Sequence, residues 1–233
     1  MKKFEKISSL VIAIIMVLQL STVTFANENN VKNIENGIEY LTVYNKANQT
    51  VQAIQHYIEK DEFVYGPVIQ VDSMSPNSVQ LKSSLRSWGP NVHQDTFLNF
   101  EYDIWYRSGS KDEWSLQRPS SVFSQNYFKV YENNSNRDLL NNWKRDVDAL
   151  NAQEWAVIGG VGLSIFNIVK AAIISHAAVA TGGTLTAAAI DSIKDSAVAA
   201  GGTAIGIGFL CTTYNNCARS YRVVYNNTDN IHY

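Results

Sequence analysis

The four histidines are the residues best suited to proton transfer or metal binding, and they are scattered along the chain. They are His56, His93, His176 and His232. His93 and Asp95 are two residues apart, so on a strand they share one face and could form a dyad. Because alternate residues of any strand share a face, this spacing does not by itself indicate a catalytic pair.

Glu101 and Asp103 are the second candidate pair, since two carboxylates on one face could divide general acid and general base roles. A solvated sheet face explains the same pattern. The sequence has no nucleophile elbow, phosphate-binding loop, dinucleotide fingerprint or HExxH motif. His176 lies in an apolar segment, where a core histidine is the ordinary finding. We therefore expect a protein that is not an enzyme and that has no cofactor and no metal site.

Cys211 and Cys217 are the two cysteines of the chain. In an oxidising compartment they are expected to pair, because the polar residues 212–216 between them are typical of a turn. Closing a loop this short would lower the entropy of the unfolded chain and so stabilise the fold by on the order of 2–3 kcal/mol. The sequence therefore predicts a disulfide between them.

The N-terminus has the three parts of a secretory signal. Lys2, Lys3 and Lys6 precede an apolar run over residues 10–20, and small residues end at Ala26. Eleven residues at 1.5 Å each cover roughly 17 Å, which is less than the ~30 Å core of a bilayer. We therefore expect a signal peptide at 1–26, cleaved after Ala26, and a secreted, extracellular protein.

The charge of the chain is weakly acidic. Residues 1–26 carry three Lys and one Glu, so their removal takes the net charge from −2 to −4. A protein of this charge has no general attraction to nucleic acid, and none is expected as a partner.

A series of short alternating segments predicts an antiparallel β-sheet or sandwich body over residues 38–132, after a disordered lead-in at 27–37. Aromatic and β-branched residues recur within each segment, as in strands. Turn residues separate the segments at short intervals, which favours an antiparallel arrangement. The expected strands are 39–44, 50–58, 63–71, 79–85, 96–107, 113–117 and 127–131.

A helical pattern follows the β body, within residues 133–154. Leu140, Trp143 and Val147 recur at helical spacing, as in an amphipathic helix. Ser135 or Asn136 is the expected N-cap, with the helix beginning at the next residues.

The segment from residue 155 to residue 210 is nearly free of charge and rich in Ala, Gly, Ile and Val. Residues 181–184, which include Gly182 and Gly183, divide it into two arms. We predict that the arms form an antiparallel helical hairpin. An arm of 26 residues would be ~39 Å long as a helix, enough to cross a bilayer core.

The second arm carries a polar stripe of Asp191, Lys194 and Asp195. Each charge costs ~2.5–3.5 kcal/mol in the middle of a membrane, so the stripe would have to face water, another subunit or an acidic medium. The alternative is that both arms pack on the sheet with this stripe in solvent. The residues expected to enter a membrane are Trp155, Ile158, Leu163, Ile165, Phe166, Ile173, Ile174, Ile205, Ile207 and Phe209.

The last segment, 211–233, is expected to hold the disulfide loop and a final strand at 218–225 that returns to the β body. The predicted fold class is thus α+β, with an apolar helical hairpin inserted before the last strand.

Two functions fit these patterns. The first is a secreted membrane-active protein, of the antimicrobial or pore-forming toxin type, that inserts the hairpin into a target membrane, with a homo-oligomer as a further expectation. In architecture alone it resembles toxins and bacteriocins that carry an apolar helical hairpin. The second is an extracellular binding or structural protein, whose aromatic β body would be the working surface and whose hairpin would be core.

Overall fold

The computed structural model describes residues 33–71, 90–107 and 111–229. Within these ranges it contains two antiparallel sheets and four α-helices, which confirms the α+β class. The predicted signal peptide, residues 27–32 of the lead-in and the predicted strand 79–85 lie outside the described residues, as does His232.

Sheet A is built from the N-terminal strands. The strand order is β1-β2-β3-β4, and β5 pairs with β3. β1 falls in the segment that was predicted to be a disordered lead-in, and it is ordered because it pairs with β2. The strands are β1 (Asn33–Glu35), β2 (Ile38–Asn45), β3 (Thr50–Tyr57), β4 (Glu62–Tyr65) and β5 (Ile69–Gln70).

Sheet B follows in the order β6-β7-β8-β9. Two of its strands have the predicted bounds, whereas the predicted strand 96–107 begins later than expected. Asn99 has a φ of 61°, and the Thr96 hydroxyl bonds both the N–H and the C=O of Phe100. These residues therefore form a turn before the strand. The strands are β6 (Val92–Asp95), β7 (Glu101–Trp105), β8 (Glu113–Gln117) and β9 (Tyr127–Tyr131).

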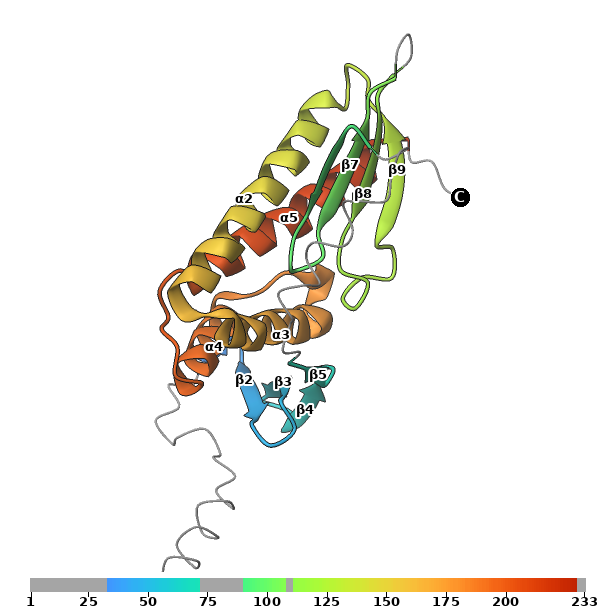
Figure 1. The fold of residues 1–233 in the computed structure, drawn as a ribbon. Coiled ribbons are helices and arrows are strands. Elements are labelled where there is room, and N and C mark those ends of the chain that lie inside the picture. The colour runs from blue at the N-terminus through green and yellow to red at the C-terminus, as the bar shows by residue number, and fades with distance from the viewer. Residues whose placement is uncertain (1–32, 72–89, 108–110, 230–233) are drawn as a thin grey trace, which may run out of the picture.

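Two long helices, α2 (Arg137–Val161) and α5 (Ile207–Asn227), pack side by side against one face of sheet B (Figure 1). The contact is made by large aromatic side chains. Trp143 of α2 lies edge-on to Phe100 and to Tyr221 of α5, with ring centroids 5.8 and 5.5 Å apart. Tyr221 also packs edge-on against Phe128 of β9. These interlocked rings hold α2 and α5 against sheet B, and all of them are buried in the core.

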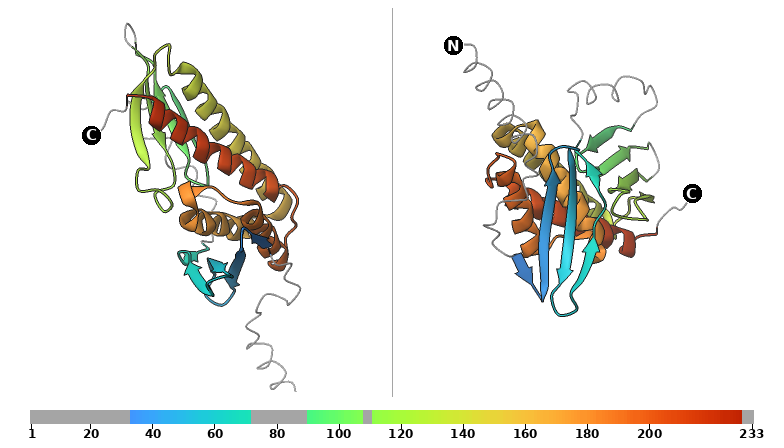
Figure 2. Two further views of the ribbon diagram at one scale, coloured as in Figure 1. Left: turned by 180° about the vertical axis from the view of Figure 1, so that it is seen from behind. Right: turned by 90° about the horizontal axis from the view of Figure 1, so that it is seen from below.

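The other two helices, α3 (Leu163–Val179) and α4 (Ala187–Ala199), cover sheet A, as the view from below shows (Figure 2). The buried residues of α4 are mostly small, whereas α3 also buries Phe166 and three isoleucines. Ser175 accepts a hydrogen bond from the Ala53 N–H of β3 at 2.8 Å. A Cβ on Gly66 would lie 2.7 Å from the same hydroxyl, so only glycine permits this approach of α3 to the sheet.

Helix α2 begins at Arg137, as the sequence predicts, with Asn136 as its N-cap residue. The Asn136 side chain does not make the expected hydrogen bond to the first turn of the helix. Instead, the Asn136 amide donates to the Tyr131 carbonyl and accepts from the Asn133 N–H, and so ties the helix start to β9. The helix also runs past the predicted end at residue 154.

Gly162 divides the first predicted arm into two helices. Its φ and ψ are 82° and 159°, a conformation that is essentially confined to glycine. The chain therefore turns between α2 and α3, and residues 155–161 belong to α2. The hairpin itself is confirmed over α3 and α4, which are joined by a 3₁₀ turn, η2 (Thr181–Gly183).

The predicted final strand at 218–225 is wrong, because this segment is part of α5. Buried residues recur three and four apart over the whole helix, which fixes a helical rather than an extended conformation. They include Leu210, Tyr214, Tyr221 and Val224.

The predicted disulfide is wrong for the same reason. Cys211 and Cys217 are free and buried, and the expected turn between them is helical. Six residues of helix place the two about 9 Å apart along the axis, whereas a disulfide needs Cα atoms within about 7 Å. Burial raises the pKa of Cys211 to about 12 and also raises that of Cys217, so neither is a reactive thiol.

Candidate functional site

One end of the molecule carries no charged residue and exposes large apolar side chains. We call it the uncharged end and define it as residues 155–165 and 196–209. The C-terminal end of α2, the start of α3, the end of α4 and the start of α5 meet here (Figure 1). Gln153 donates to the Gly206 carbonyl at 3.2 Å, and a Cβ on Gly202 would touch Ile165. These contacts hold the α4–α5 connection against the end of α2 and the start of α3.

The exposed side chains of the uncharged end are unusually large for residues in water. Ile205 is 82% exposed and Phe209 73%. Trp155 and Val198 are each 52% exposed. Because the Trp155 ring also packs edge-on against Phe97, it is held in position while half of it faces outward. Large apolar side chains exposed on segments without charge suit a surface that binds lipid or protein.

The residues predicted to enter a membrane fall into three groups. Trp155, Ile205 and Phe209 are exposed at the uncharged end. Ile158, Leu163 and Ile165 are half-buried there. The remaining four are buried in the core, three of them in α3 and one in α5: Phe166, Ile173, Ile174 and Ile207.

The predicted turn lies between α3 and α4. Gly182 and Gly183 have positive φ values of 69° and 68°. The Arg222 guanidinium of α5 donates to the Gly182 carbonyl at 2.6 Å. A Cβ on Gly183 would lie 2.2 Å from the Phe123 ring, so the turn is packed against the neighbouring loop and is not a free tip.

The polar stripe lies on the outer side of α4. Lys194 donates to Asp191 at 2.8 Å, and Asp195 accepts from the Asn33 amide of β1. A Cβ on Gly208 would be 3.2 Å from the Lys194 side chain. The stripe therefore borders the uncharged end at the start of α5.

A buried polar node joins α3 and α4 to sheet A. The Thr42 hydroxyl of β2 bonds Nε2 of His176 at 2.7 Å and the Ser192 hydroxyl at 2.8 Å. His176 is buried, and Nδ1 of its ring has no hydrogen-bond partner among the described residues. Burial lowers the pKa of His176 to about 4. Protonation of this ring would place an uncompensated charge in the interface.

A second buried titratable group lies beside the uncharged end, on α2. The Glu154 carboxylate accepts from the backbone N–H groups of Phe97 and Leu98, both at 2.8 Å. Burial raises the pKa of Glu154 to about 8, against the opposing effect of these two hydrogen bonds. Glu154 thus fastens the turn before β7 to the helix.

Polar residues gather on the outer face of sheet B, which none of the described helices covers. The register places His93, Asp103, Ser115 and Lys129 in one row across the four strands. His93 bonds Asp103 of the neighbouring strand at 2.7 Å, and not Asp95 as the dyad interpretation supposed. Glu101 and Asp103 share this face as expected. The cross-strand pair could not be read from the sequence, because it depends on the register of β6 and β7.

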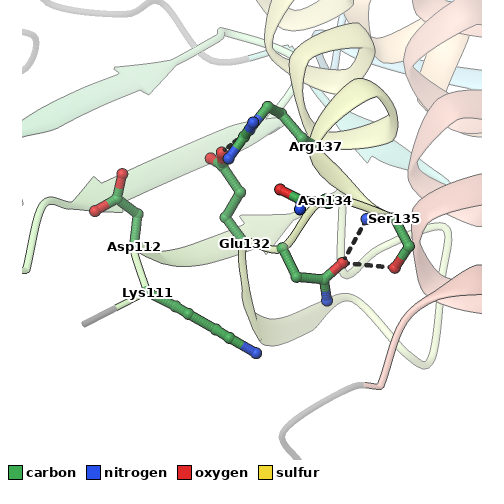
Figure 3. A pocket seen from close by; sticks show the side chains of 7 residues that line it. Lys111, Asp112, Glu132, Asn134, Ser135 and Arg137 are labelled. Atoms are coloured by element: carbon green, nitrogen blue, oxygen red, sulfur yellow. Dashed lines mark hydrogen bonds and ion pairs between the residues drawn. The ribbon is translucent and has the colours of Figure 1, made fainter.

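A shallow depression of about 670 Å³ lies beside the start of α2 (Figure 3). Its polar side chains bond one another: Arg137 pairs with Glu132 at 2.6 Å, and Asn133 accepts from the Ser135 N–H and hydroxyl. Lys111 and Asp112 complete its rim. This arrangement presents no group aimed at a substrate.

No helix among the described residues has the length and the apolar composition that crossing a bilayer requires.

Comparison with known proteins adds no relative: no family model, no curated protein and no solved structure matches this chain.

Proposed function

We propose that this protein is a secreted membrane-active protein, of the antimicrobial or pore-forming type, that meets its target bilayer through the uncharged end. The observation that carries the proposal is the strong exposure of Ile205, Phe209, Val198 and Trp155 on segments that contain no charged residue. The core of a protein interface is also depleted in charge, so a second copy of the chain or another protein is the competing occupant of this surface. A bilayer interior favours apolar groups alone.

The expected binding is weak and reversible. Complete burial of one large apolar side chain stabilises by about 1.5–3 kcal/mol, and these four are already partly covered. Together they would contribute roughly 5 kcal/mol, comparable to one myristoyl chain with a partition constant near 10⁴ M⁻¹. Firm attachment would therefore need a further step.

Release of α3 and α4 from sheet A would provide that step. If Gly162 became helical, residues 155–179 would form one helix of about 37 Å, which is long enough to span a bilayer core. Lys170 is the one Lys, Arg, Asp or Glu in this stretch, and His176 would have to be neutral again on entering lipid. The protonated form of His176 favours release, because it disrupts the node with Thr42 and Ser192. Insertion is thus expected to be faster in acid.

The first experiment measures flotation of the purified protein with lipid vesicles and leakage of a trapped dye, at neutral pH and near pH 5. Ile205→Asp with Phe209→Asp should abolish both, since each charge opposes entry into lipid. Phe63→Asp is the matched control, because Phe63 is an exposed aromatic residue of sheet A, at 46%. It should leave both unchanged.

Two results count against the proposal. One is an absence of flotation and leakage at either pH. The other is a wild-type protein that forms a dimer which the double Asp substitution dissociates, because the uncharged end would then bind a second copy of the chain.

The alternative, an extracellular binding protein, is favoured by a different observation, the polar outer face of sheet B. Aromatic residues lie beside the charged row there, with the Lys129 ammonium 5.0 Å from the Trp105 ring centroid. Tyr127 and Tyr131 are exposed on the same face. A protein that binds a polar ligand through this face, and that ignores vesicles, would support the alternative.

A further inference from the structure

We propose that His93, Glu101 and Asp103 bind a divalent transition-metal ion on the outer face of sheet B. The proposal is independent of membrane binding, and it revises the expectation of no metal site. One donor atom from each of the three side chains lies within 4.8 Å of the others. Among the described residues this is the one such group of three or more His, Cys, Asp or Glu side chains.

The geometry suits a metal ion with short bonds. Nδ1 of His93 is 2.7 Å from one Asp103 oxygen and 3.8 Å from a Glu101 oxygen. Ligands of a tetrahedral ion with bonds of about 2.1 Å lie roughly 3.4 Å apart, between these two distances. Small side-chain rotations on a fixed backbone would bring all three donors to an ion.

The site is built on rigid elements and has supporting groups. His93 and Asp103 are directly opposite across the β6–β7 pair, and Glu101 is on the same face two residues away. The Ser115 hydroxyl of β8 donates to the second Asp103 oxygen at 3.1 Å, which fixes the carboxylate with its other oxygen toward His93. Such outer-shell bonds orient metal ligands.

The donor set selects the class of ion. One imidazole nitrogen and two carboxylate oxygens suit Zn²⁺, Mn²⁺ or Fe²⁺, whereas Ca²⁺ and Mg²⁺ prefer oxygen donors only. Asp95 lies opposite Glu101 and adds negative charge beside the site. Three protein ligands leave a further position for water or for a group of a bound molecule.

Sheet A offers a contrast that serves as a control. His56 also contacts two carboxylates, Glu39 and Asp61, both at 3.1 Å. These carboxylates meet different nitrogens of the ring, Nδ1 and Nε2, so they cannot converge with it on one ion. The arrangement around His56 is the one that a chance pairing of histidine with carboxylates on a sheet would give.

The test is titration of the purified, chelator-treated protein with Zn²⁺ by calorimetry, followed by the visible spectrum with Co²⁺. We expect one saturable site and a four- or five-coordinate Co²⁺ spectrum. His93→Gln, Glu101→Gln and Asp103→Asn should each abolish saturation, and Ser115→Ala should weaken binding on the order of 10-fold. His56→Gln should bind as the wild type does.

Circular dichroism without metal confirms that each variant is folded before titration. Absence of saturable binding in the wild type would overturn the proposal. Binding that survives in all three ligand variants, or that is lost in His56→Gln, would also overturn it.

Discussion

The two sheets are covered by helix pairs of opposite character. Sheet B is covered by α2 and α5 through large interlocked rings, with Trp143 and Tyr221 at the centre. Sheet A is covered by α3 and α4 through aliphatic and small side chains, the hydrogen bond between Ser175 and Ala53, and the node of Thr42, His176 and Ser192. Interlocking rings have few alternative arrangements, whereas the hydrogen bonds of a buried node are lost when its histidine is protonated. The sheet B unit is therefore the scaffold, and the sheet A unit is the part that can open.

The largest expected effect comes from the scaffold. Trp143→Ala should destabilise the protein by about 3–5 kcal/mol, because it leaves a cavity between α2, α5 and Phe100. Denaturant unfolding followed by circular dichroism measures this. Ala172→Gly on α3 is the comparison in the other unit, and it should cost roughly 1 kcal/mol. Equal losses would contradict the division into scaffold and opening part.

The second prediction concerns Glu154, whose folded pKa of about 8 lies above its unfolded value of 4.5. The folded state binds the proton more tightly, so stability is complete below about pH 4.5 and falls as pH rises to 8, by up to roughly 5 kcal/mol. Glu154→Gln should remove this alkaline loss. Unfolding measured from pH 4.5 to 9 tests it, and an unchanged slope in the variant would refute the assignment.

The third prediction gives the sheet A unit the opposite response. The folded pKa of His176 is about 4, below the ordinary histidine value of 6.5, because the ring is buried. Stability is therefore complete above about pH 6.5 and is lost as pH falls toward 4, by roughly 3 kcal/mol. His176→Gln should remove this loss of stability at acid pH. Hydrogen exchange of α3 and α4 should rise first in acid, and simultaneous opening of both units would contradict the comparison.

His56→Gln is the matched control for this acid response. The pKa of His56 is raised, first by its hydrogen bond to Glu39, so its contribution has the opposite sign. That contribution is present at low pH and lost as pH rises. His56→Gln should therefore leave the loss of stability at acid pH unchanged.

The fourth prediction concerns the turn between α2 and α3. Gly162→Ala should destabilise by about 1–3 kcal/mol, because alanine does not tolerate this backbone conformation. No atom within 4 Å would meet the added Cβ, so the effect is one of backbone strain alone. The variant should also release dye from vesicles faster, since alanine favours a continuous helix.

Gly159→Ala is its control, because Gly159 lies inside α2 with no atom within 4 Å of an added Cβ. It should raise stability by up to about 1 kcal/mol and leave leakage unchanged. Equal effects of the two substitutions would argue against Gly162 as the hinge.

Local patterns in the sequence were sufficient for much of the fold. Period-two alternation located β8 and β9, and helical spacing located the start of α2. The glycines at 182 and 183 marked the turn between α3 and α4. These features depend on neighbours in the chain, which a sequence displays directly.

What failed depended on tertiary contacts. Residues 218–225 were expected to be a strand, yet they are helical because Tyr221 and Val224 continue a buried face that begins before Cys211. The polar residues 212–216 likewise predicted a turn between the two cysteines, whereas the buried face of α5 makes them helical. In addition, the sequence does not distinguish Gly162 from the other glycines of the apolar segment, so the end of α2 at this residue could not be predicted.

The candidate site was foreseen only in part. A charge-free region near the C-terminus was visible, but its exposed residues could not be separated from buried ones without the packing of α3 on sheet A. The pairing of His93 with Asp103 needed the strand register, and the buried bonds of Glu154 needed the position of a distant turn.

The depth of residue 205 in a bilayer tests the central claim most directly. Ile205→Cys can be labelled selectively with an environment-sensitive fluorophore, because both native cysteines are buried. With vesicles, the label should shift to the blue and be quenched by quenchers attached to lipid chains, whereas a label at Phe63→Cys should not respond. A label at residue 205 that stays in water while the protein binds vesicles would contradict the account.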